Sequence, residues 1–202
     1  MKISLSPEWI TAIAGIITAL TIILIWWQIR ADHERSRREK AIELMDTFTG
    51  RIHEISPGVR YARKLLDKLD ERQCECLWNL DAFSIDAKHE YLLNGSLEEL
   101  GKNLRLEKEG SQILLTQTQV SVLRSLTASY LNILETIFAA WRHNIADREI
   151  IEDEFDLLIM PKKDHFPLEK IRIASGKYPS LAAFSDAIKR KRSRMPEKSK
   201  VA

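Results

Sequence analysis

Few residues in this chain have a type and spacing that suit chemistry, and Cys74 and Cys76 come first. Zinc and redox sites normally use cysteines separated by two or more residues, and a zinc site needs further ligands. The chain has no other cysteine, and none of its histidines follow a His-x-x-x-His spacing. The five histidines are His33, His53, His89, His143 and His165. On a helix the two thiols would point about 200° apart, so we expect one buried thiol, one partly exposed thiol and no metal site.

Motifs for other reactions are missing from the sequence. It holds no phosphate-binding glycine loop, no nucleophile elbow and no dinucleotide fingerprint. Acidic residues gather between Glu149 and Asp156, but at this spacing most of them would form the solvated face of a helix, opposite Ile151 and Phe155. The sequence therefore predicts a protein without enzymatic activity and without a cofactor.

One carboxylate, Glu135, lies in the most apolar helical segment of the chain. A buried carboxylate needs a partner, because its charge loses hydration. Two interpretations stay open. Glu135 lies on an exposed edge with Asn132 and Arg142, or it makes an ion pair or polar contact with another helix.

The composition limits the class of protein whose helices or strands must position these residues. The chain has 202 residues, of which 45% are hydrophobic, and this excludes wholesale disorder. Two cysteines exclude a disulfide framework. The formal net charge of +2 hides an uneven distribution, because basic residues cluster just after residue 29 and again after residue 188.

Residues 9–29 form a run of 21 residues without a charge, rich in Ile, Leu and Ala. At 1.5 Å per residue this run is about 30 Å long as a helix, which matches the hydrocarbon core of a bilayer. Trp9 lies at one end and Trp26 and Trp27 at the other, where aromatic rings favour the headgroup level. We expect a transmembrane helix over 9–29. A cleaved signal peptide is the alternative, but its apolar region would be unusually long.

The charges beside this helix predict its orientation. Only Lys2 precedes it, whereas several basic residues follow it: Arg30, Arg35, Arg37, Arg38 and Lys40. By the positive-inside rule, residues 1–8 lie outside and the rest of the chain lies in the cytoplasm, attached to the membrane by a single pass.

Small residues recur every four positions along the apolar helix, at Thr11, Gly15 and Ala19. Such a face lets a second helix approach closely, which predicts a homo-oligomer. Thr18 and Thr21 add a polar edge that could line a pore, but threonine hydroxyls usually bond to carbonyls of their own helix.

For residues 30–188, the predicted cytoplasmic part, the sequence predicts an all-α fold. The membrane helix is expected to continue through the charged stretch as far as Ser56, where Pro57 opens a second helix and completes a two-helix hairpin. Short helices are expected around 74–80 and 86–93, with a turn at Asn94 and Gly95 and a capping box that starts at Ser96. The core helix is predicted over 117–142, with a capping box of Thr116 and Gln119 at its start and a stop at Asn144. Shorter helices are expected over 147–160, with Asp147 as its cap, and over 168–174 and 180–191. The one strand signal is the short apolar run over 112–115.

Residues 189–202 form a basic segment, expected to be a disordered tail. An anionic bilayer surface attracts such cations by about 1 kcal/mol each. The predicted lipid contacts are Arg30, Arg35, Arg37, Arg38, Lys189, Arg190, Lys191 and Arg192. The segment is less suited to nucleic acid than to a bilayer surface, because it has no interleaved aromatic residues that could stack on bases.

Three segments carry a resemblance to a known family. They are residues 37–44 after the membrane helix, residues 130–137 leading through 145–147, and the closing residues 178–181. Their order resembles the uncharacterised bacterial proteins with domain of unknown function 4760, and the resemblance covers most of the chain except residues 70–113. It implies a membrane-anchored helical architecture in a bacterial cell and carries no catalytic residues.

These observations favour a non-enzymatic interaction or scaffold module, anchored in the inner membrane, that binds a copy of itself or a cytoplasmic protein. By analogy with small anchored helical proteins, the protein is a candidate for a role in phage defence or in a prophage. The alternative is a depolarising effector that oligomerises through its membrane helix.

Overall fold

The computed structural model describes residues 7–54, 57–98, 101, 106–159 and 167–194. Its elements follow one another as α1 (Pro7–Glu54), α2 (Pro57–Leu66), α3 (Glu71–Asn79), β1 (Phe83–Asp86), η1 (Ala87–His89), α4 (Glu90–Ser96), β2 (Glu107–Glu109), β3 (Gln112–Leu115), α5 (Gln117–Arg142), α6 (Arg148–Ile159), α7 (Pro167–Ser175) and α8 (Pro179–Arg194). The chain is therefore mainly helical, as the sequence predicts.

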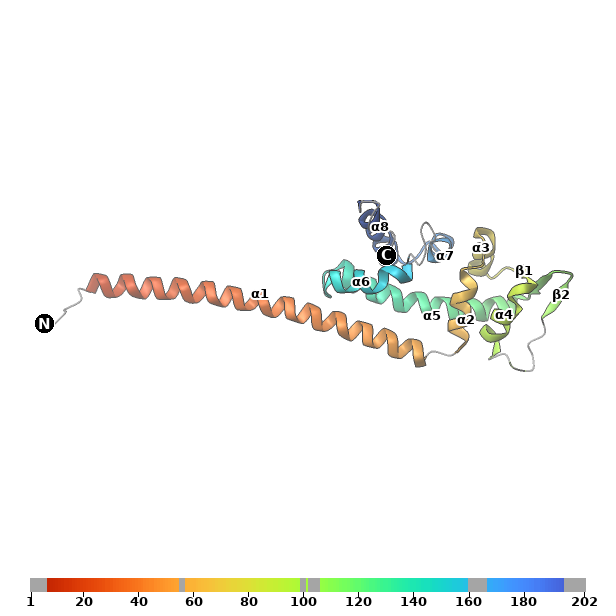
Figure 1. Ribbon diagram of the computed structural model, residues 1–202, viewed down its shortest axis with the longest axis horizontal. Coiled ribbons are helices and arrows are strands. Elements are labelled where there is room, and N and C mark those ends of the chain that lie inside the picture. The colour runs from red at the N-terminus through yellow and green to blue at the C-terminus, as the bar shows by residue number, and fades with distance from the viewer. Residues whose placement is uncertain (1–6, 55–56, 99–100, 102–105, 160–166, 195–202) are drawn as a thin grey trace.

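The long helix α1 projects far beyond the rest of the molecule (Figure 1). Its N-terminal half stands free, and its C-terminal half runs along the other helices. Ion pairs between Arg30 and Glu34 and between Arg35 and Glu39 join successive turns where the apolar run ends. The expectation that the apolar helix continues without a break through the charged stretch is confirmed.

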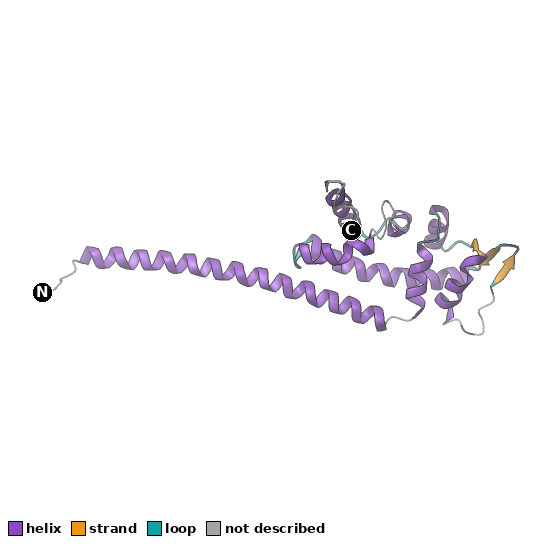
Figure 2. Cartoon of the chain, in the orientation of Figure 1, coloured by secondary structure: helices purple, strands orange, loops and turns teal. Residues whose placement is uncertain are grey.

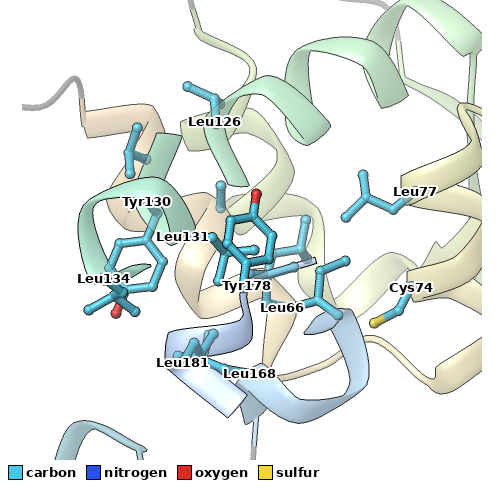
Figure 3. Close-up of a cluster of buried hydrophobic side chains, with 14 of the residues drawn as sticks. Leu66, Cys74, Leu77, Leu126, Tyr130, Leu131, Leu134, Leu168, Tyr178 and Leu181 are labelled. Carbon is cyan, nitrogen blue, oxygen red and sulfur yellow. The ribbon is translucent and has the colours of Figure 1, made fainter. Parts of the chain in front are cut away.

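Helix α5 forms the centre of the core and packs against α8, α2 and α3. Phe138 on α5 stacks on Phe184 of α8, with ring centroids 4.1 Å apart, and meets Phe155 of α6 edge-on. Phe155 in turn contacts Phe48 of α1, so α1 belongs to the same core. Figure 3 shows a neighbouring part of the core, where side chains of α2, α3, α5, α7 and α8 converge around Leu131.

A small antiparallel sheet in the order β1-β3-β2 covers one end of the helices (Figure 2). Ile85 on β1 pairs with Ile113 on β3, and both side chains are fully buried. The strand over 112–115 is the one strand that the sequence predicts. Its partners are too short for their alternating pattern to stand out, since β1 has four residues and β2 has three.

Between β1 and β2 the local predictions were partly wrong. Asn94 and Gly95 lie inside α4 instead of forming a turn, because Gly95 lets α4 pack directly on Tyr61 of α2. A Cβ at Gly95 would lie 2.4 Å from Cδ2 of Tyr61. The hydroxyl of Ser96 donates to the carbonyl oxygen of Leu92 in the same helix, and Glu99, the other residue of the predicted capping box, lies outside the described residues.

Other local predictions were correct. Thr116 and Gln119 form the capping box at the start of α5, and Asn144 adopts a left-handed φ of 58° just after that helix ends. The predicted hairpin of α1 and α2 is wrong. Helix α2 turns away from α1 at Pro57 and packs mainly on α4 and α5, which take up its apolar face (Figure 1).

The prediction of a disordered tail from residue 189 is also wrong for its first part. Helix α8 continues to Arg194, because Lys189, Lys191 and Arg192 form ion pairs with carboxylates of α6 and α7. Residues 195–202 lie outside the described part of the chain.

Candidate functional site: the free apolar helix, its joint and a basic pocket

The apolar half of α1 is the most unusual surface of the molecule. It is long and apolar enough to cross a membrane, and none of its most apolar stretch is buried against the rest of the chain. Leu24 is 69% exposed, and the predicted interface residues Trp9, Trp26 and Trp27 are all more than half exposed. A helix that formed the core of a soluble domain would instead bury these side chains.

The predicted association face lies open on this part of α1. A Cβ built on Gly15 meets no atom within 4 Å, so no other element of the described chain covers the face around Thr11, Gly15 and Ala19. The hydroxyls of Thr18 and Thr21 donate to the carbonyl oxygens of Ala14 and Ile17 at 2.9 and 2.8 Å. These two hydroxyls are thus satisfied within their own helix, as threonine usually is in apolar surroundings.

Basic residues follow the apolar run on the same helix. The guanidinium of Arg30 lies 5.7 Å from the ring centroid of Trp26, and Arg30 and Arg35 both pair with glutamates one turn later. These pairs are exposed to solvent, so each contributes little to helix stability. Exposed pairs of this kind can exchange the glutamate for an anionic headgroup at little cost.

Asp147 joins the start of α6 to α1. Its carboxylate caps α6 by accepting hydrogen bonds from the backbone N–H groups of Glu149 and Ile150. Its own backbone N–H donates to the carbonyl oxygen of Arg37 at 3.0 Å, and its Oδ2 atom lies 3.6 Å from Nε of Arg38. The sequence predicted the cap but not the bonds to α1.

The joint is packed as well as hydrogen-bonded. Ala41, one turn beyond Arg37, is completely buried, and Ala146 beside Asp147 is buried too. Small side chains at both places let the backbones of α1 and the α5–α6 turn approach closely. Helix α1 therefore packs directly against the α5–α6 turn at this point.

The C-terminal cations have internal partners. Lys191 pairs with Glu152 and Asp153, and Arg192 pairs with Asp156 at 2.8 Å. Burial acts to lower the pKa of Lys191, but hydrogen bonds and charge attraction from Glu152 and Asp153 outweigh it and raise that pKa. Arg190 donates to the backbone carbonyl oxygen of Asp186 in its own helix. These contacts hold α8 on α6, a role that the sequence did not suggest.

The structure decides between the two interpretations of Glu135. Its two carboxylate oxygens accept hydrogen bonds from the backbone N–H groups of Ser180 and Leu181, at 2.8 and 2.9 Å. Glu135 thus makes a polar contact with another helix, because its partners are backbone N–H groups at the start of α8. The half-buried carboxylate satisfies N–H groups that have no partner within α8.

The cysteines do not form a site. The side chain of Cys74 is completely buried, and burial raises the pKa of its thiol to about 11, whereas Cys76 is half-buried. The prediction of one buried and one partly exposed thiol is confirmed. In the described ranges, no group of three or more His, Cys, Asp or Glu side chains is placed to hold a metal ion.

A basic pocket at the start of α2 was missed by sequence reasoning. The cavity has a volume of about 410 Å³, and it is lined by Pro57, Val59, Arg60, Tyr61, Arg63, Lys64 and Tyr130. The only signal in the sequence is the clustering of three cations within five residues, from 60 to 64. That signal is weak, because such a cluster usually lies on a solvated helix face.

Comparison with protein-family models, with curated proteins and with solved structures finds no match to this chain. The resemblance to the proteins with domain of unknown function 4760 stays a prediction. The case for function therefore rests on the geometry of this chain alone.

Proposed function

We propose that this protein is a non-enzymatic interaction module, anchored in a membrane by α1, with its remaining helices in the cytoplasm. The observation that carries the proposal is the apolar half of α1, which is uncharged over residues 9–29 and unburied by any described element. Soluble monomers rarely expose a contiguous apolar surface larger than a few hundred Å². A bilayer removes this surface from water.

The tryptophans and the cations support the same placement. Trp9, Trp26 and Trp27 lie at the two ends of the apolar run, at the height expected for both membrane interfaces. The excess of Lys and Arg after the run favours a cytoplasmic location for the larger part. In a bacterium, which the family resemblance suggests, the membrane is the inner membrane.

The joint at Asp147 adds a geometric argument for a module held close to the bilayer. Arg37 lies eight residues beyond Ile29, which is about 12 Å along a helix. The α5–α6 turn therefore lies just outside the headgroup layer when 9–29 spans the core. Ile145 in this turn is 55% exposed, beside Arg142 and His143. Bilayer contact at this turn adds to the contacts proposed for Arg30, Arg35, Arg37 and Arg38.

Partner binding follows from the anchoring. The open face of Thr11, Gly15 and Ala19 supports a homo-oligomer within the membrane, and the cytoplasmic helices are free to receive a protein partner. A setting in phage defence or in a prophage follows from the analogy with small anchored helical proteins.

The decisive experiment measures membrane insertion. Leu20→Arg places a charge in the middle of the span and is expected to lower the membrane-bound fraction after alkaline extraction, because arginine there costs about 3 kcal/mol of insertion. Ile173→Arg is the matched control, since Ile173 is 64% exposed on α7. Equal extraction of both variants and the wild type would contradict the anchor. A reporter fused to each terminus in turn tests the orientation.

The second candidate is a depolarising effector that associates through α1. The open small-residue face favours it, while the internal bonds of Thr18 and Thr21 count against a pore with a polar lining. Membrane potential after induction, read with a voltage-sensitive dye, separates the candidates. An effector depolarises cells as wild type and as Ile17→Leu, and fails as Gly15→Ile. An unchanged potential in all three supports the anchored module.

A further inference from the structure

The turn between α5 and α6 is a rigid corner of the backbone. Asn144 has a left-handed φ of 58° and donates its N–H to the carbonyl oxygen of Trp141 at 3.1 Å. The N–H of Ile145 donates to the carbonyl oxygen of Ala140 at 2.9 Å. These two bonds form a Schellman motif, which ends a helix and directs the chain away from it. The backbone therefore fixes where Ile145 lies.

Ile145 departs from the usual form of this motif. An apolar residue at its position often packs on the last turn of the preceding helix. Here the residues that would receive it are Ala139 and Ala140, which offer little side-chain surface, and Ile145 remains 55% exposed. A single exposed isoleucine is common on protein surfaces, so its meaning depends on what lies beside it.

A bilayer would lie beside this turn. The turn is at the end of the helical domain nearest to the free half of α1 (Figure 1), and Asp147 donates its N–H to the carbonyl oxygen of Arg37 there. Arg37 lies eight residues beyond Ile29, about 12 Å along the helix. The headgroup layer outside the hydrocarbon core is about 5 to 8 Å thick. When residues 9–29 span the core, the turn is within about one side-chain length of the headgroups.

The charges at this end of the molecule allow it to approach lipid phosphates. The last carbonyl groups of a helix carry partial negative charge, which phosphates would repel. Arg148 neutralises this end of α5, because its guanidinium donates to the carbonyl oxygens of Trp141 and Arg142, both at 3.0 Å. Over residues 30–40 and 142–149 together, seven Lys and Arg residues outnumber five Asp and Glu residues.

We propose that Ile145 is a second membrane contact, which enters the headgroup layer and holds α1 tilted toward the α5–α6 turn. This inference rests on the proposed anchoring of α1 and adds to it a defined direction of tilt. The occupant of the exposed surface at Ile145 is the same bilayer that α1 spans. Apolar and basic side chains at a membrane interface are known to set the tilt of a spanning helix.

The size of the required tilt is ordinary. Neighbouring helices lie about 8 to 10 Å apart, so a turn beside α1 moves about 3 Å toward the bilayer when α1 tilts by about 20°, the average for membrane helices. The same tilt shortens the height of the apolar run by only about 6%, so residues 9–29 still match the hydrocarbon core.

The depth of the turn is measured by fluorescence quenching on the full-length protein in phospholipid nanodiscs. A fluorophore is coupled to His143→Cys in a Cys76→Ser background, where the remaining Cys74 is buried. A quencher on the lipid headgroup is expected to quench this label, whereas a quencher at the end of the acyl chain is not. The same label at Arg72→Cys, exposed on α3 far from the free half of α1 (Figure 1), is expected to stay unquenched. Equal quenching of the labels at 143 and 72 overturns the proposal.

A substitution then tests Ile145 itself. Ile145→Ser is expected to remove at least half of the headgroup quenching at position 143, because the apolar side chain that holds the turn in the headgroup layer is lost. Ile173→Ser is the matched control, since Ile173 is equally exposed on α7, and is expected to change nothing. Quenching that is the same in both variants shows that Ile145 makes no such contact. The circular dichroism spectrum shows that each variant is folded.

Failure of the anchor and failure of this contact give different results. A label at Leu20→Cys, in the middle of the apolar run, reports the span. If the acyl-chain quencher does not quench it, α1 does not cross the bilayer and both proposals fall. If it is quenched while the label at 143 is not, the anchor stands and only the contact at Ile145 is overturned.

Discussion

The carboxylate of Glu135, in the middle of α5, accepts a hydrogen bond from the backbone N–H of Ser180 at 2.8 Å, 45 residues further along the chain. The other carboxylate oxygen accepts from Leu181. A side chain of α5 thus caps the N-terminus of α8. In most helices the cap is a Ser, Thr, Asp or Asn that directly precedes the helix in the sequence. This contact fixes where α8 begins on α5.

Replacing Glu135 with alanine is expected to lower the free energy of unfolding by about 2 kcal/mol, because two hydrogen bonds to a charged group are lost. Glu135→Gln keeps one acceptor oxygen and is expected to lose less. Denaturant unfolding of the full-length protein in detergent measures both. Asn132→Ala is the control, since Asn132 is exposed on the same helix. Equal stability of Glu135→Ala and Asn132→Ala would contradict the capping role.

Local signals in the sequence predicted much of this fold. The capping box of Thr116 and Gln119, the stop at Asn144 and the cap at Asp147 depend on residues at most three positions apart, so they can be read directly. The long apolar run of α1 is equally local. These local features predict the helices and the candidate membrane span.

What the sequence did not predict depends on residues far apart in the chain. The bond from Asp147 to Arg37, the pairing of Lys191 with Glu152 and the small sheet each need a partner whose position only the folded chain defines. The prediction of a disordered tail from residue 189 failed for this reason. The positive charge of the segment suggests exposure to solvent, and only the folded chain places the carboxylates of α6 beside it. The basic pocket was missed because Tyr130 lies 66 residues from Lys64.

The joint at Asp147 gives a second prediction. Asp147→Ala removes the cap of α6 and the charge opposite Arg38, and is expected to cost about 1 to 2 kcal/mol of unfolding free energy. Arg38→Gln removes only a largely exposed ion pair and is expected to cost less than about 0.5 kcal/mol of unfolding free energy. Hydrogen exchange of residues 147–151 measures the local opening. Protection that is unchanged in Asp147→Ala would show that α6 docks on α1 without this residue.

The two thiols give a prediction with a pH dependence. Burial raises the pKa of Cys74 to about 11, so its thiolate is scarce at pH 8. Below that pKa, the thiolate fraction increases about tenfold for each unit by which the pH is raised. Alkylation of the native protein is therefore expected to modify Cys76 first and Cys74 only after unfolding. Mass spectrometry of the peptides, with Cys76→Ser as the control, identifies the modified residue. Rapid labelling of Cys74 at pH 8 would mean that α3 does not stay packed on α7.

Tyr130 gives a further prediction. Because its buried hydroxyl has no partner among the described residues, Tyr130→Phe removes an unsatisfied polar group and is expected to raise the free energy of unfolding by up to about 1 kcal/mol. Burial raises the pKa of this hydroxyl to about 12, so it stays protonated and the gain is expected to be the same from pH 6 to 9.

Unfolding of the full-length protein measures this gain, and Tyr91→Phe, at a residue that is 62% exposed, is the control with no expected change. A loss of stability in Tyr130→Phe would show that the buried hydroxyl has a partner in the folded protein.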